Sequence, residues 1–388
     1  MNFYVHKSQM DKDSEYYELK MQNLEDAEKA FKNDSLITSL FPPRINIQSN
    51  YSCNAQCTIC PIKRPLKGNK NMDISLFGKI AKELFPTTIV ASTTTIGEPL
   101  LLPWFAYMLK IMDKHSVLAD IVTNATLIDD EMINVILNVA ADIKISYDGI
   151  TEKTFNLMRP GCSKQTVEKT LQKFVKQRTI LQPKQNPTIT MQTTLIKSNI
   201  HELPEIVKYA GESGVDRIKA YYAISYNPEI DADVLAGDDS EYTSYIDHSR
   251  EIAKSVGIEF EAAESSANLN EMYLKRVKCP TPWYQTWIDF DGTIRMCHAH
   301  SGYNIGNANK GIIECWNNDN YQKIRAASIE NTEGSPCWNC GMLFSQIDDN
   351  TVAPYDRSNF ISKYSTNRKE DGIKWSNRTR LFDTGRLQ

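Results

Sequence analysis

The sequence predicts an α/β protein: a partial (β/α)6 TIM-like barrel followed by a small cysteine-rich module. Between residues 44 and 223, six short strand-like runs alternate with helical patterns, which is the order expected of a parallel sheet covered by helices. Six strands are fewer than the eight of a closed barrel, so we expect the barrel to be open. Seven of the nine cysteines form an early and a late group, and the late group marks the module.

An N-terminal helical extension, residues 1–43, precedes the barrel. Its apolar residues recur at helical spacing and predict one amphipathic helix from about 13 to 33, and Pro42-Pro43 closes the extension. In the barrel region, 44–223, strands are predicted at 44–50, 88–93, 119–124, 141–148, 188–196 and 217–223, and helical patterns lie at about 73–85, 100–115, 129–139, 163–181 and 199–213.

Three segments follow the barrel region. Residues 224–278 begin with an acidic, loop-rich stretch and are predicted to bridge two units. Residues 279–345 form the cysteine-rich module, with a predicted hairpin at WIDFDGTIRM whose turn is Asp291-Gly292. Residues 346–388 are polar, show little periodicity and are predicted to form a wrapping or partly mobile tail.

Composition excludes several classes of function. Lys and Arg total 44 against 48 Asp and Glu, a net charge of −4, so we expect no nucleic-acid or membrane partner. Apolar stretches such as 132–143 are short and interrupted, and the N-terminus lacks an apolar signal region. We therefore expect a cytoplasmic protein, in which clustered cysteines favour metal or redox chemistry over disulfides.

The early cysteine group has the spacing Cys53-x3-Cys57-x2-Cys60, directly after the first predicted strand. Three thiolates do not complete a tetrahedral zinc site, but they can hold three irons of a four-iron cluster and leave the fourth iron open for a ligand. The place also suits a functional loop, because such loops follow the carboxyl ends of parallel strands.

With this motif in this place, the sequence resembles the radical S-adenosylmethionine (SAM) enzymes from about residue 44 to 345. The resemblance implies a [4Fe-4S] cluster on Cys53, Cys57 and Cys60, with SAM chelating the open iron. It also implies an external electron donor such as flavodoxin or ferredoxin, reductive cleavage of SAM to a 5′-deoxyadenosyl radical, and hydrogen abstraction from a substrate.

The resemblance extends to polar residues at successive strand ends. It implies SAM contacts for Gly97, Glu98, Pro99, Asn124, Ser146, Asp148, Arg159 and Asn199. Three positions depart from the family pattern, because Ile96 and Ala125 replace glycines and Ile59 stands where many members carry an aromatic residue. Taken singly, residues such as Asn124 or Ser146 are more often capping or turn residues than ligand contacts.

The late group contains Cys279, Cys297, Cys337 and Cys340, which can close either a zinc site or a four-iron cluster; spacing alone favours zinc. The pattern, with Gly292-x4-Cys297, is similar to the SPASM/Twitch auxiliary domain of radical SAM enzymes. Because no cysteine follows Cys340, this resemblance implies a single auxiliary [4Fe-4S] cluster, suited to accept an electron.

Two catalytic candidates remain in the barrel region, Arg159 and Cys162. A thiol at Cys162 could donate a hydrogen atom to a substrate radical, as in the epimerases of the family, or it could be an ordinary loop cysteine. Cys315 is expected to be a buried small side chain, with cluster ligation as the alternative. His298 and His300 are either substrate contacts or surface residues.

Three functions are compatible with these features. The first is an oxidoreductase or epimerase acting on a small polar metabolite (a sugar, aminocyclitol or natural-product intermediate), since the two-cluster layout resembles aminocyclitol dehydrogenases and sugar epimerases. The second is modification of a ribosomal peptide by crosslinking or epimerisation, against which the 43-residue extension is short for a peptide-binding domain of about eighty residues. The third is a metal-stabilised scaffold without catalysis.

Overall fold

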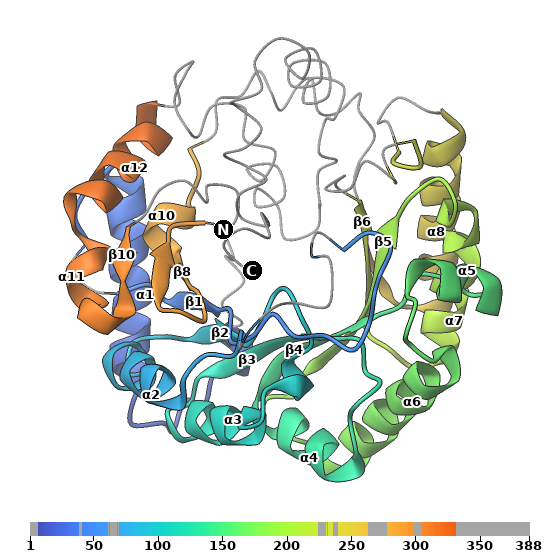
Figure 1. The fold of residues 1–388 in the computed structure, drawn as a ribbon, viewed down its shortest axis with the longest axis horizontal. Helices are drawn as coiled ribbons and strands as arrows, with labels where there is room; N and C mark the ends of the chain where they lie inside the picture. The colour runs from blue at the N-terminus through green and yellow to red at the C-terminus, as the bar shows by residue number, and fades with distance from the viewer. Residues whose placement is uncertain are drawn as a thin grey trace.

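The computed structural model describes residues 7–38, 41–60, 62, 68, 70–223, 230, 232–235, 240–262, 278–297 and 305–330. Its strands form one ten-stranded sheet with the order β10-β9-β8-β1-β2-β3-β4-β5-β6-β7. The sheet curves into an open arc with helices on its outer side (Figure 1). This is the partial α/β barrel that the sequence predicts.

All six predicted strands are present within two or three residues of their expected ends, and four more join them. The strands are β1 (Arg44–Ile47), β2 (Val90–Ser92), β3 (Leu118–Thr123), β4 (Ala140–Ser146), β5 (Thr188–Leu195), β6 (Arg217–Tyr222), β7 (Glu259–Ala262), β8 (Gln285–Ile288), β9 (Thr293–Arg295) and β10 (Gly306–Asn307). Neighbours from β8 through β1 to β7 pair in parallel, whereas β8–β9 and β9–β10 are antiparallel.

Four helices of the outer layer begin at a capping side chain. Asp73, Asp129, Thr151 and Ser163 each accept a hydrogen bond from a backbone N–H two or three residues later. The helices are α1 (Tyr17–Lys32), α2 (Ile74–Leu84), α3 (Phe105–Lys114), α4 (Asp130–Val139), α5 (Glu152–Met158), α6 (Lys164–Leu181), α7 (Leu203–Glu212), α8 (Ser240–Val256), α10 (Thr281–Tyr284), α11 (Ile313–Trp316) and α12 (Asp319–Glu330). In this described part of the chain, no helix is long and apolar enough to cross a bilayer.

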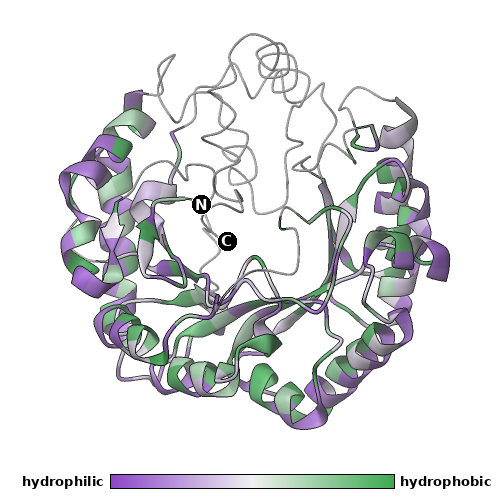
Figure 2. Cartoon of the chain, in the orientation of Figure 1, coloured by the Kyte–Doolittle hydropathy of each residue, from purple (hydrophilic) through white to green (hydrophobic). Residues whose placement is uncertain are grey.

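Alternate strand residues divide between an apolar outer face and a polar inner face. Ile45, Ile121, Ile143 and Met191 belong to one buried cluster with helix residues such as Phe77. Figure 2 shows hydrophobic residues where the helices adjoin the sheet and hydrophilic residues on the outer surfaces of the helices. The core therefore lies between sheet and helices, as in other parallel α/β architectures.

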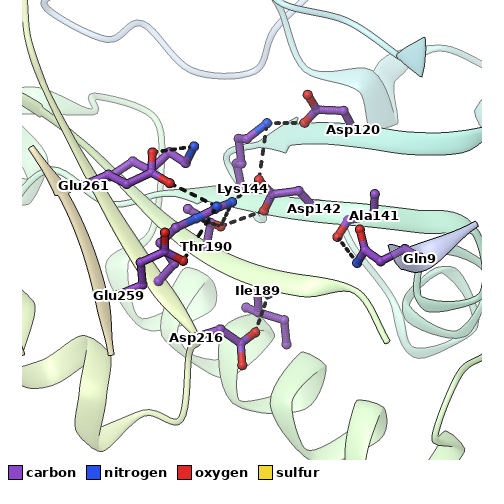
Figure 3. A network of polar contacts seen from close by, with 12 residues as sticks. Gln9, Asp120, Ala141, Asp142, Lys144, Ile189, Thr190, Asp216, Glu259 and Glu261 are labelled. Carbon is purple, nitrogen blue, oxygen red and sulfur yellow. Dashed lines mark hydrogen bonds and ion pairs between the residues drawn. The ribbon is translucent and has the colours of Figure 1, made fainter. Parts of the chain in front are cut away.

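The inner face carries a chain of ion pairs that begins at Arg44 on β1 and ends on β7. Figure 3 shows its part from Asp120 on β3 to Glu259 and Glu261 on β7. Asp120 pairs with Arg44 and Lys144, and its pKa is lowered because both cations oppose the effect of burial. Four cations and four carboxylates take part, and the formal charges cancel: Arg44, Lys144, Arg217 and Lys219 with Asp120, Asp142, Glu259 and Glu261.

The region after the barrel adds to the same sheet. Strand β7 lies in the segment that was expected to be a bridge and pairs with β6 in parallel. The predicted hairpin is confirmed as β8–β9, and its turn contains Gly292 at φ +83°. Because β8 pairs with β1 in parallel, the hairpin of the cysteine-rich module continues the barrel sheet.

Candidate functional site

The early cysteine loop follows β1 at the carboxyl edge of the sheet, and its three cysteines are half-buried. Hydrogen bonds of the main chain hold it on two sides. Glu98 N donates to Ser52 O at 2.7 Å, which ties the loop to the segment after β2. Gln56 N donates to Pro160 O at 2.8 Å and Thr58 N to Met158 O at 3.1 Å, which tie it to the end of α5.

Two glycines allow these segments to approach the loop. Gly97 has φ +119°, and a Cβ there would lie 2.8 Å from Asn50 Oδ1 and 2.9 Å from Ser52 O. Gly161 has φ +90°, and a Cβ there would lie 2.9 Å from Asn54 O. A side chain at either position would be strained and would push the main chain apart. Gly97 therefore allows the segment after β2 to lie close to the cysteine loop, and Gly161 does the same for the segment after α5.

Glu98 joins the end of β3 to the segment after β2. Its carboxylate accepts hydrogen bonds from Thr123 Oγ1 at 2.7 Å, Asn124 N at 2.7 Å and Leu100 N at 3.4 Å. Burial raises the pKa of Glu98 to about 7, against these donors, which favour the charged form. Pro99 follows at the start of a 3-10 turn, Pro99–Leu101.

Asn124 lies against the cysteine loop. Its Nδ2 donates to Asn54 Oδ1 at 2.8 Å and lies 3.9 Å from Cys53 Sγ, while its Oδ1 accepts from Thr126 N at 3.0 Å. The carboxylate of Glu98 holds the main chain of Asn124. The predicted residues of the second and third strand ends are thus connected to each other and to the first cysteine.

Arg159 connects the fourth strand end to the second cysteine. Its Nε forms an ion pair with Asp148 Oδ2 at 2.6 Å, and its Nη1 donates to Cys57 Sγ at 3.7 Å. Asp148 is completely buried and also accepts from Thr194 N at 2.7 Å. Burial raises the pKa of Asp148 while the guanidinium opposes the rise, and the carboxylate raises the pKa of Arg159.

Asn199, Ser146 and Cys162 lie around this pair. Asn199 is fully buried, and its Nδ2 donates to Asp148 O and Thr194 O, both at 2.9 Å, so its amide holds the main chain of Asp148. Ser146 is the buried last residue of β4. Cys162 is buried one turn after Arg159, and burial raises the pKa of its thiol to about 12.

Gln48, directly after β1, is a buried residue that no sequence motif singles out. Its side chain is buried, and its Nε2 donates to Asn50 O and Ile96 O, both at 2.5 Å. Its Oε1 accepts from Thr95 Oγ1 at 2.5 Å and Ile96 N at 3.2 Å. Gln48 therefore fixes the turn that leads into Gly97 and Glu98.

The cysteine loop fits a four-iron cluster better than a single ion. Its donor set is three thiolates, one short of the four ligands that close a structural zinc site. In a cluster each thiolate binds a different iron. Burial raises the pKa of Cys57 to about 11, an effect that iron reverses because coordinated thiols lose their protons.

The late cysteines are described in part. Cys279 lies just before α10 and Cys297 just after β9, and both are half-buried. Cys337, Cys340, His298 and His300 lie outside the described residues. Cys315 Sγ donates to Gly311 O at 3.1 Å and fills the space beside Gly306, where a Cβ would lie 2.4 Å from it. Cys315 is half-buried, less enclosed than the buried side chain predicted for it, and its sulfur packs beside Gly306.

Comparison with protein families gives two matches. The model of the radical SAM superfamily matches residues 47–210, and that of the SPASM iron-sulfur cluster-binding domain matches residues 279–341. A cofactor-modifying protein for the tungsten-containing aldehyde ferredoxin oxidoreductase of Pyrococcus furiosus is 27% identical over 205 residues. That alignment covers 52% of this chain and 57% of the relative, so it spans little more than half of the relative's length.

Solved structures share the fold. SuiB of Streptococcus suis, bound to the precursor peptide SuiA, has a TM-score of 0.60 at 16% identity and covers 79% of this chain and 71% of its own. The enzyme anSMEcpe with bound AdoMet and the Cp18Cys peptide has a TM-score of 0.57 at 14% identity and covers 84% of this chain and 98% of its own.

Proposed function

The chain carries a radical SAM domain followed by a SPASM iron-sulfur domain, and on this basis we propose that it removes a hydrogen atom from its substrate by SAM-derived radical chemistry. One observation carries the proposal. The loop of Cys53, Cys57 and Cys60 lies at the carboxyl edge of the parallel sheet, where Asn124 after β3 and Arg159 at the end of α5 reach two of its sulfurs. Strand ends of this kind carry the active sites of parallel α/β folds.

Cys53, Cys57 and Cys60 would hold the cluster that binds SAM. Such a cluster, when bound, would supply the electron that cleaves SAM reductively and so yields the 5′-deoxyadenosyl radical. The described residues prepare the place for this chemistry: Glu98 fixes the end of β3, and Asp148 fixes Arg159. Because the end of β3 and Arg159 are already held in place before SAM binds, binding would have to order few further groups, which favours affinity.

Cys279 and Cys297, with Cys337 and Cys340 outside the described residues, would hold the auxiliary cluster. Such a group supplies a one-electron acceptor, which a net oxidation of the substrate requires. The β8–β9 hairpin that connects Cys279 to Cys297 is hydrogen-bonded to β1, the strand that leads to the early cysteine loop. The continuous sheet supports a fixed relation between the two cysteine groups.

Two substrate classes are candidates. A small polar metabolite is favoured by the relative from Pyrococcus furiosus, whose name describes modification of a cofactor. A peptide is favoured by SuiB and anSMEcpe, whose structures contain peptides. In either class the product is an oxidised or an inverted centre, and inversion would use the Cys162 thiol as the hydrogen donor.

The test is anaerobic formation of 5′-deoxyadenosine by the reconstituted protein with dithionite, SAM and cell extract separated by molecular size. Stimulation by the low-mass fraction supports a metabolite, and stimulation by the macromolecular fraction supports a peptide or protein. The matched control is the Cys53→Ala/Cys57→Ala/Cys60→Ala variant, which should form none. If the wild-type protein binds iron at the early loop but never cleaves SAM, the proposal is wrong.

A further inference from the structure

Arg159 contacts both a cysteine of the early loop and a buried carboxylate. Its own positive charge and the negative charge of that carboxylate have opposite electrostatic effects on the cysteine. Its Nη1 donates to Cys57 Sγ at 3.7 Å, and its Nε pairs with Asp148 Oδ2 at 2.6 Å. Arg159 is only 8% exposed and Asp148 is not exposed at all. Charges so poorly screened by water act strongly over a few ångströms.

Asp148 is itself held from three sides. Its other oxygen accepts from Thr194 N at 2.7 Å, its main-chain carbonyl accepts from Asn199 Nδ2 at 2.9 Å, and Thr193 Oγ1 holds the neighbouring carbonyl of Tyr147 at 2.7 Å. The carboxylate that holds the guanidinium is thus fixed by β5 and the segment after it, while the main chain on either side of Arg159 is hydrogen-bonded to the cysteine loop. Such a contact is a property of the protein before any ligand arrives.

A hydrogen bond from a cation to a cluster sulfur stabilises the reduced cluster, which carries one more negative charge, and therefore raises its reduction potential. A cluster that acts as a strong reductant requires a low reduction potential instead. The Asp148 carboxylate supplies a compensating negative charge, so that Cys57 receives a directed hydrogen bond from a pair with no net charge.

We propose that Arg159 and Asp148 together set the reduction potential of the cluster held by Cys53, Cys57 and Cys60, with Arg159 acting through Cys57 and Asp148 positioning and neutralising Arg159. This inference rests on the proposed function, because it requires a cluster at the early loop. It goes further by assigning the pair an electrostatic role that contact with SAM does not require.

The test measures the midpoint potential of the early cluster by anaerobic dithionite titration, followed by electron paramagnetic resonance. The signal of the early cluster is identified as the part that changes on addition of SAM and that is missing in the triple cysteine-to-alanine variant. We expect Arg159→Gln to lower the potential and Asp148→Asn to raise it. We expect the double variant, whose pair is again without net charge, to return toward the wild-type value.

The expected size follows from one charged hydrogen bond, whose loss changes the ratio of oxidised to reduced cluster by about tenfold or more, or about 59 mV for one electron. Arg159→Lys keeps the charge and should stay closer to wild type than Arg159→Gln. Iron and sulfide content shows that each variant has loaded its clusters.

Shifts of the two single variants in the same direction, or no shift in loaded protein, would overturn the inference while the proposed function stands. If the wild-type protein itself shows no cluster signal that responds to SAM, the proposed function fails, and the inference fails with it.

Discussion

Replacement of Gln48 by Glu keeps the shape of the side chain, removes its donor group and introduces a negative charge when the carboxyl group is ionised. In the wild type, Gln48 Nε2 donates to the buried carbonyls of Asn50 and Ile96. A carboxylate there leaves two buried acceptors without their donor, at about 1–3 kcal/mol each. We therefore expect Gln48→Glu to lower the free energy of unfolding by about 2–6 kcal/mol at pH 7 and to weaken SAM binding, because the turn leads into Gly97 and Glu98.

Urea denaturation of the reconstituted protein between pH 5 and pH 8 tests this expectation. A protonated carboxyl group regains one donor, so the destabilisation of Gln48→Glu should shrink as pH falls. Gln48→Met is the matched control, since it also lacks the donor but has no charge, and its destabilisation should not depend on pH. An unfolding free energy of Gln48→Glu within about 0.5 kcal/mol of wild type at every pH would refute the argument, because surface substitutions have effects of that size.

Three further predictions concern other buried groups. Lys20 is buried, its Nζ donates to His115 O and Ser116 O at 2.7 Å, and burial lowers its pKa from 10.5 to about 7. Between pH 7 and pH 10 the unfolded chain therefore binds more protons at Lys20 than the folded chain does, so folding becomes more favourable as the pH rises. The urea midpoint of the wild type should rise relative to that of Lys20→Met over this range. A difference between the two midpoints that does not change with pH would contradict this. Lys219 and Glu261 form an ion pair at 2.6 Å, so Lys219→Met should lower the free energy of unfolding by about 3 kcal/mol in denaturation experiments. Adding Glu261→Leu should recover part of that loss. If the losses of the two single variants simply add in the double variant, the two residues are not coupled. If the reaction is an inversion, Cys162→Ala should still form 5′-deoxyadenosine but give no inverted product, as chiral analysis of the product would show; normal inversion would remove Cys162 from the mechanism.

Much of the fold could be predicted because each signal was local. The strands up to β6 lie in strand-like runs that alternate with helical patterns, and the hairpin turn carries Asp291-Gly292. Strand β7 was placed in a bridge because its four residues, EFEA, alternate charged and apolar groups without a long apolar run. Its pairing with β6 is a long-range fact that composition does not contain.

The candidate site could be predicted where a motif has fixed spacing and could not where a residue acts through distant partners. Cys53, Cys57 and Cys60 are recognised from eight consecutive positions. Gln48 is a single polar residue after a strand, and its importance depends on contacts 47 and 48 positions away, to Thr95 and Ile96. A buried amide must satisfy all its donors and acceptors, but the sequence does not say that Gln48 is buried.

The inner face of the sheet shows why charge patterns along a chain mislead. Alternating charged residues on β6 and β7 are typical of a solvent-exposed face, yet Lys219 and Glu261 are 3% and 2% exposed. Their enclosure is compatible with stability because each charge meets its partner across the sheet: Lys219 lies opposite Glu261 in the strand register, and the formal charges along the whole chain of ion pairs cancel. A buried charge is tolerated only when it is paired. Comparing charges between register partners of neighbouring strands, rather than along one strand, would therefore have predicted this face to be enclosed.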